Sequence, residues 1–218
     1  MLGVVSNKYR SLVAVMTVLA LGVGLAGCGV NNIPTYETAA KSGFAEVQNQ
    51  YKRRTDLIGN LVETVKGAAQ QEQDTLTRVI EARAKATQIK VDASTITDPA
   101  KFKEFQDAQD RLGGALGRLL AVSEAYPDLK SNQNFLGLQA ELAGTENRIA
   151  TARRDYNLSV QRYNTELVTI PGRWWRAFMY AGSKEMAFFQ ASEEDTKAPK
   201  VDFGKAKPAT TPAPTTKP

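Results

Sequence analysis

Two Tyr-Asn pairs, Tyr156-Asn157 and Tyr163-Asn164, lie seven residues apart and are the first sign of a site with chemistry. Seven residues make about two helical turns, so both pairs fall on one face of a helix. The rings can fill the seam between helices while the hydroxyl and amide groups form hydrogen bonds across it. We therefore interpret the repeat as a ladder that sets the register of the helices rather than as a catalytic pair.

Catalytic chemistry has little support elsewhere in the chain. The sequence contains no histidine, which excludes Ser-His-Asp and Cys-His arrangements and removes the commonest transition-metal ligand. Paired carboxylates such as Glu63 with Glu72, or Asp128 with Glu146, are conceivable, but such groups usually lie on solvated faces. The sequence also lacks a Gly-rich phosphate loop, a Walker motif and a Gly-x-Ser-x-Gly elbow. We expect no catalytic residue, no metal site and no cofactor, and hence a protein that is not an enzyme.

Charged residues on apolar helix faces form the second set of candidates. Arg54 and Glu72 continue the spacing of one apolar stripe, and Glu146 and Arg153 continue that of another. Such residues can pair between helices, where they set register more than they add stability. The alternative is a polar ligand pocket inside the bundle.

The elements that must position these residues are helices. From residue 36 onward, apolar residues recur at spacings of three, four or seven, as in a coiled coil, over 36–90, 99–124 and 131–169. A single helix over 36–90 would be about 80 Å long and would leave its apolar stripe uncovered. A reversal near Gly67, in "VKGAAQQE", allows four helices to alternate up and down, although one glycine is a poor turn signal. The predicted fold is an all-α, antiparallel up-and-down bundle of four helices over residues 36–191.

The two ends of this body differ in composition. Residues 173–189, "RWWRAFMYAGSKEMAFF", contain both tryptophans and three phenylalanines. This segment is either a membrane-interface or partner-docking element, or a short helix that covers the open end of the bundle. Residues 192–218 are rich in Pro, Thr, Ala and Lys and predict a disordered tail.

The N-terminal sequence has the features of a targeting signal. Lys8 and Arg10 precede an uncharged apolar segment, residues 11–27, and Cys28 is the only cysteine. The residues Leu25-Ala26-Gly27-Cys28 resemble a bacterial lipobox, which predicts a signal peptide over 1–27, acylation of Cys28 and a tether over 28–35. The alternative is an uncleaved transmembrane helix. Several acyl chains would hold the protein stably on a membrane, facing the periplasm.

The expected partners follow from this targeting signal. The amino acid after Cys28 is glycine rather than the aspartate that signals inner-membrane retention, which favours the outer membrane of a Gram-negative envelope. The formal net charge of +5 includes Lys8 and Arg10, and the excess is too small to predict nucleic-acid binding. We expect contact with membrane lipid through acylated Cys28 and with an unidentified envelope protein.

Several motifs occur in an order and spacing that resemble the LemA family. They are "YKRRTDLIGNLVETVKGAAQQE" (51–72), "EAR" (81–83), "YPDLKSNQNFLGLQAELAGTENRIATARRDYNLSVQRYN" (126–164) and "APKVDF" (198–203). The resemblance implies an α-helical bundle tethered to a membrane near its N-terminus, with no established enzymatic activity. This chain departs from the family's common form in its lipoprotein-like start, and in Gly59, where the family often has proline.

Twelve of the residues that match the family motifs are the candidate binding residues. They are Arg53, Arg54, Asp56, Asn60, Glu72, Arg83, Glu146, Arg153, Tyr156, Asn157, Tyr163 and Asn164. We predict a non-enzymatic, membrane-anchored scaffold or adaptor of the bacterial envelope. The alternative is a binding module that holds a ligand in a polar pocket of the bundle.

Overall fold

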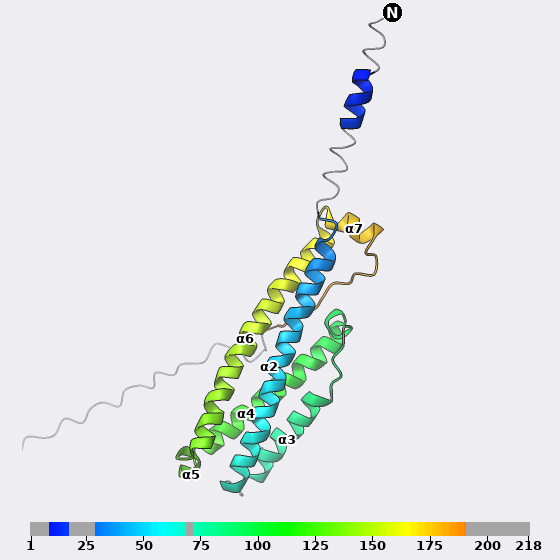
Figure 1. Ribbon diagram of the computed structural model, residues 1–218. Coiled ribbons are helices and arrows are strands. Elements are labelled where there is room, and N and C mark those ends of the chain that lie inside the picture. Colours follow the sequence, from blue (N-terminus) through cyan, green and yellow to red (C-terminus); the bar gives the residue numbers. More distant parts are fainter. Residues whose placement is uncertain (1–8, 18–28, 69–71, 191–218) are drawn as a thin grey trace, which may run out of the picture.

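The computed structural model of the chain describes residues 9–17, 29–68 and 72–190 (Figure 1). Cys28 and the predicted tail over 192–218 lie outside the described residues, as does most of the predicted signal peptide. Residues 9–17 are helical. In the three described segments, no helix has both the length and the apolar character needed to cross a bilayer.

Four long helices form the body. They are α2 (Asn32–Ala68), α3 (Gln73–Gln88), α4 (Pro99–Ser123) and α6 (Gln133–Val168). Three short helices lie in the connections and at the end: η1 (Thr95–Thr97), α5 (Pro127–Lys130) and α7 (Gly172–Phe178). The described residues contain no β-strand, so the all-α prediction is confirmed. The helix count exceeds the predicted four because the connections themselves form short helices.

Local signals explain where these helices begin. The Asp98 side chain accepts hydrogen bonds from the backbone N–H groups of Ala100 and Lys101, and Pro99 occupies the first turn of α4. Asn132 caps α6 in the same way. The segment 36–90 is divided between α2 and α3, which run in opposite directions (Figure 1). The predicted reversal near Gly67 therefore occurs.

The four helices differ greatly in length, and this shapes the bundle. The 37 residues of α2 span about 55 Å, whereas the 16 residues of α3 span about 24 Å. α6 packs antiparallel against α2, while α3 and α4 form a shorter hairpin against the far half of that pair (Figure 1). We call the half where α2 begins and α6 ends the proximal tier, and the other half the distal tier.

The distal tier has an aliphatic core supplied by four helices and α5. Its fully buried side chains include Ile58, Leu61, Leu112, Leu119 and Leu142. Phe135 is the one phenylalanine in this cluster. Side chains of this kind pack by interdigitation at the spacings that the sequence predicts.

The proximal tier has an aromatic core. Phe44, Phe102, Phe105, Tyr156 and Phe189 are all buried in one cluster. Their rings are in contact, with centroids 5.5 Å apart for Phe44 and Tyr156 and 4.7 Å apart for Phe102 and Phe189. Offset and edge-on arrangements of this kind add stability beyond that of the buried area.

α3 is too short to reach the proximal tier. An extended segment packs there in the position that a fourth helix would occupy. Residues 184–190, which we call the strap, run back from α7 across the long helices (Figure 1). Ala187 N–H in the strap donates to the carbonyl of Ile96, 2.8 Å away, which joins the strap to η1. Met186 and Phe189 are buried in the proximal core.

Candidate functional site: a polar layer and a clamped strap

A buried arginine marks the boundary between the two tiers. Arg54 lies on α2 between Tyr51 of the proximal core and Ile58 of the distal core, and only 3% of its surface is exposed. One guanidinium nitrogen, Nη1, donates to Glu146 Oε1 on α6 at 3.0 Å. The other, Nη2, donates to the backbone carbonyl and to the side-chain Oε1 of Gln109 on α4, at 3.0 and 2.7 Å. This one side chain therefore links three helices.

A second arginine extends the layer toward the proximal tier. Arg153 Nε on α6 donates to the Tyr51 hydroxyl at 2.5 Å, and its Nη2 donates to Asp110 Oδ1 on α4 at 2.9 Å. The guanidinium also lies over the Tyr51 ring, 5.4 Å from its centroid, and over the Phe189 ring at 5.1 Å. The Arg54 guanidinium also lies over the Tyr51 ring, 5.0 Å from its centroid. The two cations thus share one aromatic ring.

The environment of the layer keeps Tyr51 and Arg153 in fixed charge states. Burial raises the pKa of Tyr51, although the nearby charges of Arg153 and Arg54 oppose that shift. Burial alone would lower the pKa of Arg153, but Tyr51 and Asp110 raise it overall. Tyr51 therefore stays neutral and Arg153 stays charged at neutral pH.

Hydrogen bonds between helices show that Arg54, Gln109 and Glu146 lie at one level of the bundle. Arg54 occupies a core position of α2, and Gln109 lies between Phe105 and Leu112 on the core face of α4. The predicted pairing of Arg and Glu between helices is present in the Arg54–Glu146 contact. Such a layer matches polar positions with polar positions, and so it opposes any slip of one helix along another.

The polar layer opens onto a groove of about 1090 Å³ on the side formed by α3, α4 and α6. Arg78, Arg111 and Arg118 line this groove, and none of them forms an ion pair with another described residue. The Nε of Arg54 is buried and has no hydrogen-bond partner among the described residues. The groove therefore presents several cations that the bundle itself does not neutralise.

The Tyr-Asn repeat clamps the strap. Asn157 Nδ2 donates to the Phe189 carbonyl at 2.9 Å, and its Oδ1 accepts from Phe189 N–H at 3.0 Å. Asn164 forms the same two bonds with Met186, both at 2.9 Å. Each amide thus pairs with the backbone of one strap residue as a neighbouring β-strand would.

The tyrosines of the repeat support the same contact. The Tyr156 hydroxyl donates to the Ala187 carbonyl at 2.9 Å, and the Tyr163 side chain hydrogen-bonds to Ser183. Both rings are fully buried in the proximal core, as the sequence indicates. The hydrogen bonds, however, reach an extended segment rather than another helix, so the ladder that we expected between helices is a clamp on the strap.

The remaining candidate residues are scattered. Glu72 accepts a hydrogen bond from the Tyr126 hydroxyl at 3.0 Å at the distal end, and this bond raises the pKa of Tyr126. Arg83 Nε donates to the Thr55 carbonyl at 2.9 Å, where Gly59 leaves room, because a Cβ there would lie 3.1 Å from the guanidinium.

Three other candidates lie on the surface of α2. Arg53 forms an exposed ion pair with Glu141 at 3.5 Å, and Asp56 and Asn60 are exposed. The structure thus brings Arg54, Glu146 and Arg153 together and places Arg53, Asp56, Asn60, Glu72 and Arg83 elsewhere.

Sequence reasoning missed three members of the layer: Tyr51, Gln109 and Asp110. Tyr51 has the spacing of a core residue on its helix, and its hydroxyl gives no periodic signal. Gln109 falls in the spacing of the α4 stripe between two core residues. A polar residue at such a position is the one signal that could have identified it.

Comparison with known proteins adds the family. The LemA family profile matches residues 43–203. Magnetosome protein MamQ 2 of Paramagnetospirillum magneticum is 29% identical over 170 residues, which cover 71% of this chain and 61% of that protein. MamQ of Magnetospirillum gryphiswaldense is 28% identical, with 72% of this chain and 62% of that protein covered.

A relative outside the magnetosome proteins also matches. Protein LemA of Metamycoplasma hominis is 28% identical over 164 residues, which cover 75% of this chain and 69% of that protein. The chain spans about three fifths of the length of the magnetosome relatives. The family match extends over most of the described bundle, including the polar layer, both Tyr-Asn pairs and the strap, so this chain belongs to the LemA family.

Proposed function

We propose that this protein is a membrane-tethered scaffold or adaptor of the bacterial envelope, anchored by lipid on Cys28, and that it is not an enzyme. Family membership supports a helical protein of this kind. The magnetosome relatives are named for a structure rather than for a reaction. The lipobox-like residues before Cys28 support the anchor.

The observation that carries this proposal is that the interior arginines are hydrogen-bonded to other residues of the bundle. The Arg54 guanidinium is bonded to Glu146 and to Gln109, and the Arg153 guanidinium to Tyr51 and Asp110. These groups hold α2, α4 and α6 in one register. A rod with fixed register presents its outer faces in a constant arrangement, which is what an adaptor requires.

The groove along α3, α4 and α6 is the face that we assign to the partner. Its free cations, Arg78, Arg111 and Arg118, favour a partner with an acidic surface. A photo-crosslinking amino acid at Arg111 should capture one discrete partner in intact cells. The same amino acid at Arg162, an exposed position of α6 outside the groove, is the matched control. Equal capture from both positions would contradict the assignment of this face.

The anchor has a separate test. The Cys28→Ser variant should accumulate as an uncleaved precursor and should lose metabolic labelling with a palmitate analogue. Wild-type chain should be labelled and shortened by the length of the signal peptide. Equal labelling of the two chains would exclude the lipid anchor.

A second function, binding of an anionic small molecule, is favoured by one feature. Arg54 lines the groove and its buried Nε is unpartnered among the described residues. Native mass spectrometry of the chain extracted from membranes should then show an added mass, which Arg118→Gln should remove and Arg162→Gln should not. A bare chain mass in both the wild type and these variants would contradict this function.

A further inference from the structure

The proximal end of the bundle exposes a group of large apolar side chains. Trp174 is 57% exposed and Phe178 is 82% exposed, and Val168, Ile170 and Met179 are each more than half exposed. We call these five residues the end patch. All five lie where α6 ends and α7 crosses the end of the bundle (Figure 1). Clusters of this kind on a surface are typical of sites that contact another apolar phase.

Local packing forces this exposure. Gly172 is so close to the backbone of Glu166 that a Cβ there would collide with its carbonyl oxygen, so α7 turns directly across the end of the bundle. Trp174 and Phe178 are four residues apart and share the outer face of α7. Trp175 is turned toward the proximal core and is partly buried. The segment therefore covers the bundle end with one face and presents aromatic rings with the other.

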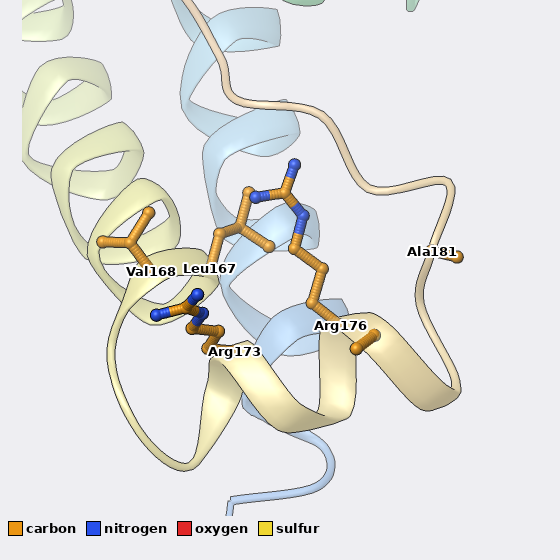
Figure 2. A pocket seen from close by; sticks show the side chains of 6 residues that line it. Leu167, Val168, Arg173, Arg176 and Ala181 are labelled. Carbon is orange, nitrogen blue, oxygen red and sulfur yellow. The ribbon is translucent and has the colours of Figure 1, made fainter.

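Two arginines accompany the end patch. Arg173 and Arg176 line a depression of about 520 Å³ together with Leu167, Val168, Ala177 and Ala181. Figure 2 shows the Arg173 guanidinium near Val168 at the end of α6 and the Arg176 side chain extending past Leu167. Neither side chain forms an ion pair with another described residue, and no acidic residue lines the depression. The depression is therefore positively charged and apolar at once.

Gly29, the residue that follows the predicted anchor in the sequence, lies beside this surface. A Cβ at Gly29 would lie 3.2 Å from Pro171 Cγ, next to Ile170 of the end patch. Asn32 Nδ2, at the start of α2, donates to Glu166 Oε1 at 3.2 Å and fixes that approach. Cys28 is the residue before Gly29, so an acyl chain on Cys28 would bring the membrane to the end patch.

We infer that the end patch docks on the surface of an anionic phospholipid bilayer. Tryptophan and other apolar side chains favour the boundary between headgroups and acyl chains, and arginine binds lipid phosphates there. Arg173 and Arg176 are placed to take these phosphates while Trp174 and Phe178 enter the boundary. The bundle then stands on its proximal end, with the distal tier directed away from the bilayer. This inference rests on the proposed lipid anchor.

Both tryptophans of the chain lie in α7, which makes the docking directly measurable. The full lipidated chain is reconstituted in vesicles of phosphatidylglycerol and phosphatidylcholine with brominated acyl chains, which quench nearby indoles. In Trp175→Phe, the remaining Trp174 should lose most of its emission and shift to the blue. In Trp174→Phe, the remaining Trp175 should be quenched much less, because it faces the core.

A charge variant tests the headgroup contact. The pair Arg173→Gln and Arg176→Gln should reduce Trp174 quenching on phosphatidylglycerol vesicles. On vesicles of phosphatidylcholine alone, where the net surface charge is absent, this pair should change it little. Equal quenching of the two chains on both vesicle types would overturn the role of the arginines.

Co-sedimentation and mass spectrometry separate failure of docking from failure of the anchor. If the lipidated chain sediments with vesicles but Trp174 is quenched no more than Trp175, docking is wrong and the anchor stands. If mass spectrometry of the chain purified from membranes shows no lipid on Cys28, the anchor itself is wrong, whatever the quenching.

Discussion

The proximal and distal tiers share α2, α4 and α6 but close their cores in different ways. The distal tier is completed by α3 and filled with aliphatic side chains, whereas the proximal tier is completed by the strap and filled with aromatic rings. An extended segment is thinner than a helix, and large rings fill the space that remains. A bundle can therefore extend beyond the end of its shortest helix if an extended segment and large aromatic rings complete the core there.

The two closures differ in what they depend on. The distal tier relies on helix packing, much of it between the neighbouring helices α3 and α4. The proximal tier relies on bonds between α6 and a segment 22 to 32 residues further along the chain. We expect the proximal tier to be opened by single changes in the strap that leave the distal tier folded.

The largest effect should come from Phe189→Ala in the strap. This removes a ring that contacts Phe44, Phe102, Phe105 and Tyr156, and it should lower the free energy of unfolding by about 3–5 kcal/mol. Phe188→Ala is the matched control, because the Phe188 side chain is 41% exposed and its loss should cost far less. Amide exchange should rise in the proximal tier first. Similar losses from the two variants would remove the distinction between the tiers.

A smaller effect is expected from Arg54→Leu at the boundary. The change removes three helix-to-helix contacts and leaves the Gln109 side chain unpaired, which should cost about 2–3 kcal/mol of stability. Arg53→Leu breaks only an exposed pair with Glu141 and should cost about 0–1 kcal/mol. Urea denaturation of both variants measures the difference. If Arg54→Leu were neutral, the layer would not be what holds the register.

The hydrogen bonds between the asparagines and the strap should contribute less to the free energy of unfolding than Phe189 or Arg54 does. Asn157→Ala or Asn164→Ala leaves one N–H and one carbonyl of the strap unpaired, which should cost about 1–2 kcal/mol each. Hydrogen exchange should increase at Met186 and Phe189 and stay unchanged in the distal tier. If both variants kept full stability yet abolished partner capture, the repeat would be a binding site rather than a clamp.

The smallest effect at neutral pH, and the most specific one, belongs to Tyr156→Phe. Loss of its hydrogen bond to the Ala187 carbonyl should cost about 1 kcal/mol. Burial raises the pKa of Tyr156 above the 10.0 of a free phenol, so its neutral form is favoured in the folded state. That stabilisation is complete below pH 10 and is lost above it, since the unfolded chain then releases a proton that the folded chain retains.

The variant should therefore respond less to alkali than the wild type. The stability difference between the two chains should shrink as pH rises above 10, which urea midpoints at pH 7 and at alkaline pH would measure. Parallel pH curves would mean that the Tyr156 hydroxyl is not buried in the proximal tier.

Periodicity made much of the bundle predictable. Residues such as Ile58, Leu112 and Leu142 are buried where spacing places them, because a helix brings residues three, four and seven apart to one face. Asp98 and Asn132 mark helix starts because their short side chains reach the first free N–H groups. Polar residues on apolar stripes also indicated that Arg and Glu could pair between helices, but they did not show that Arg54 pairs with Glu146.

The strap was not predictable in the same way. Residues 184–190 have no regular structure, and their backbone groups are paired by side chains from α6. The local sequence of the strap does not indicate that side chains of a distant helix pair with its backbone. The sequence showed that the two Tyr-Asn pairs share a face, but it could not show whether a helix or an extended chain lies opposite.

By itself, the sequence determined the all-α class, the family, the main helices and the face on which each polar residue lies. All of these depend on interactions within a few residues along the chain or on motif order. Only the tertiary structure decided that α3 ends short of the proximal tier and that the strap replaces it. It also decided that Tyr51 joins the polar layer and that Trp174 faces outward while Trp175 faces the core. These outcomes depend on which distant surfaces meet, and burial and hydrogen bonding between them carry no periodic signal.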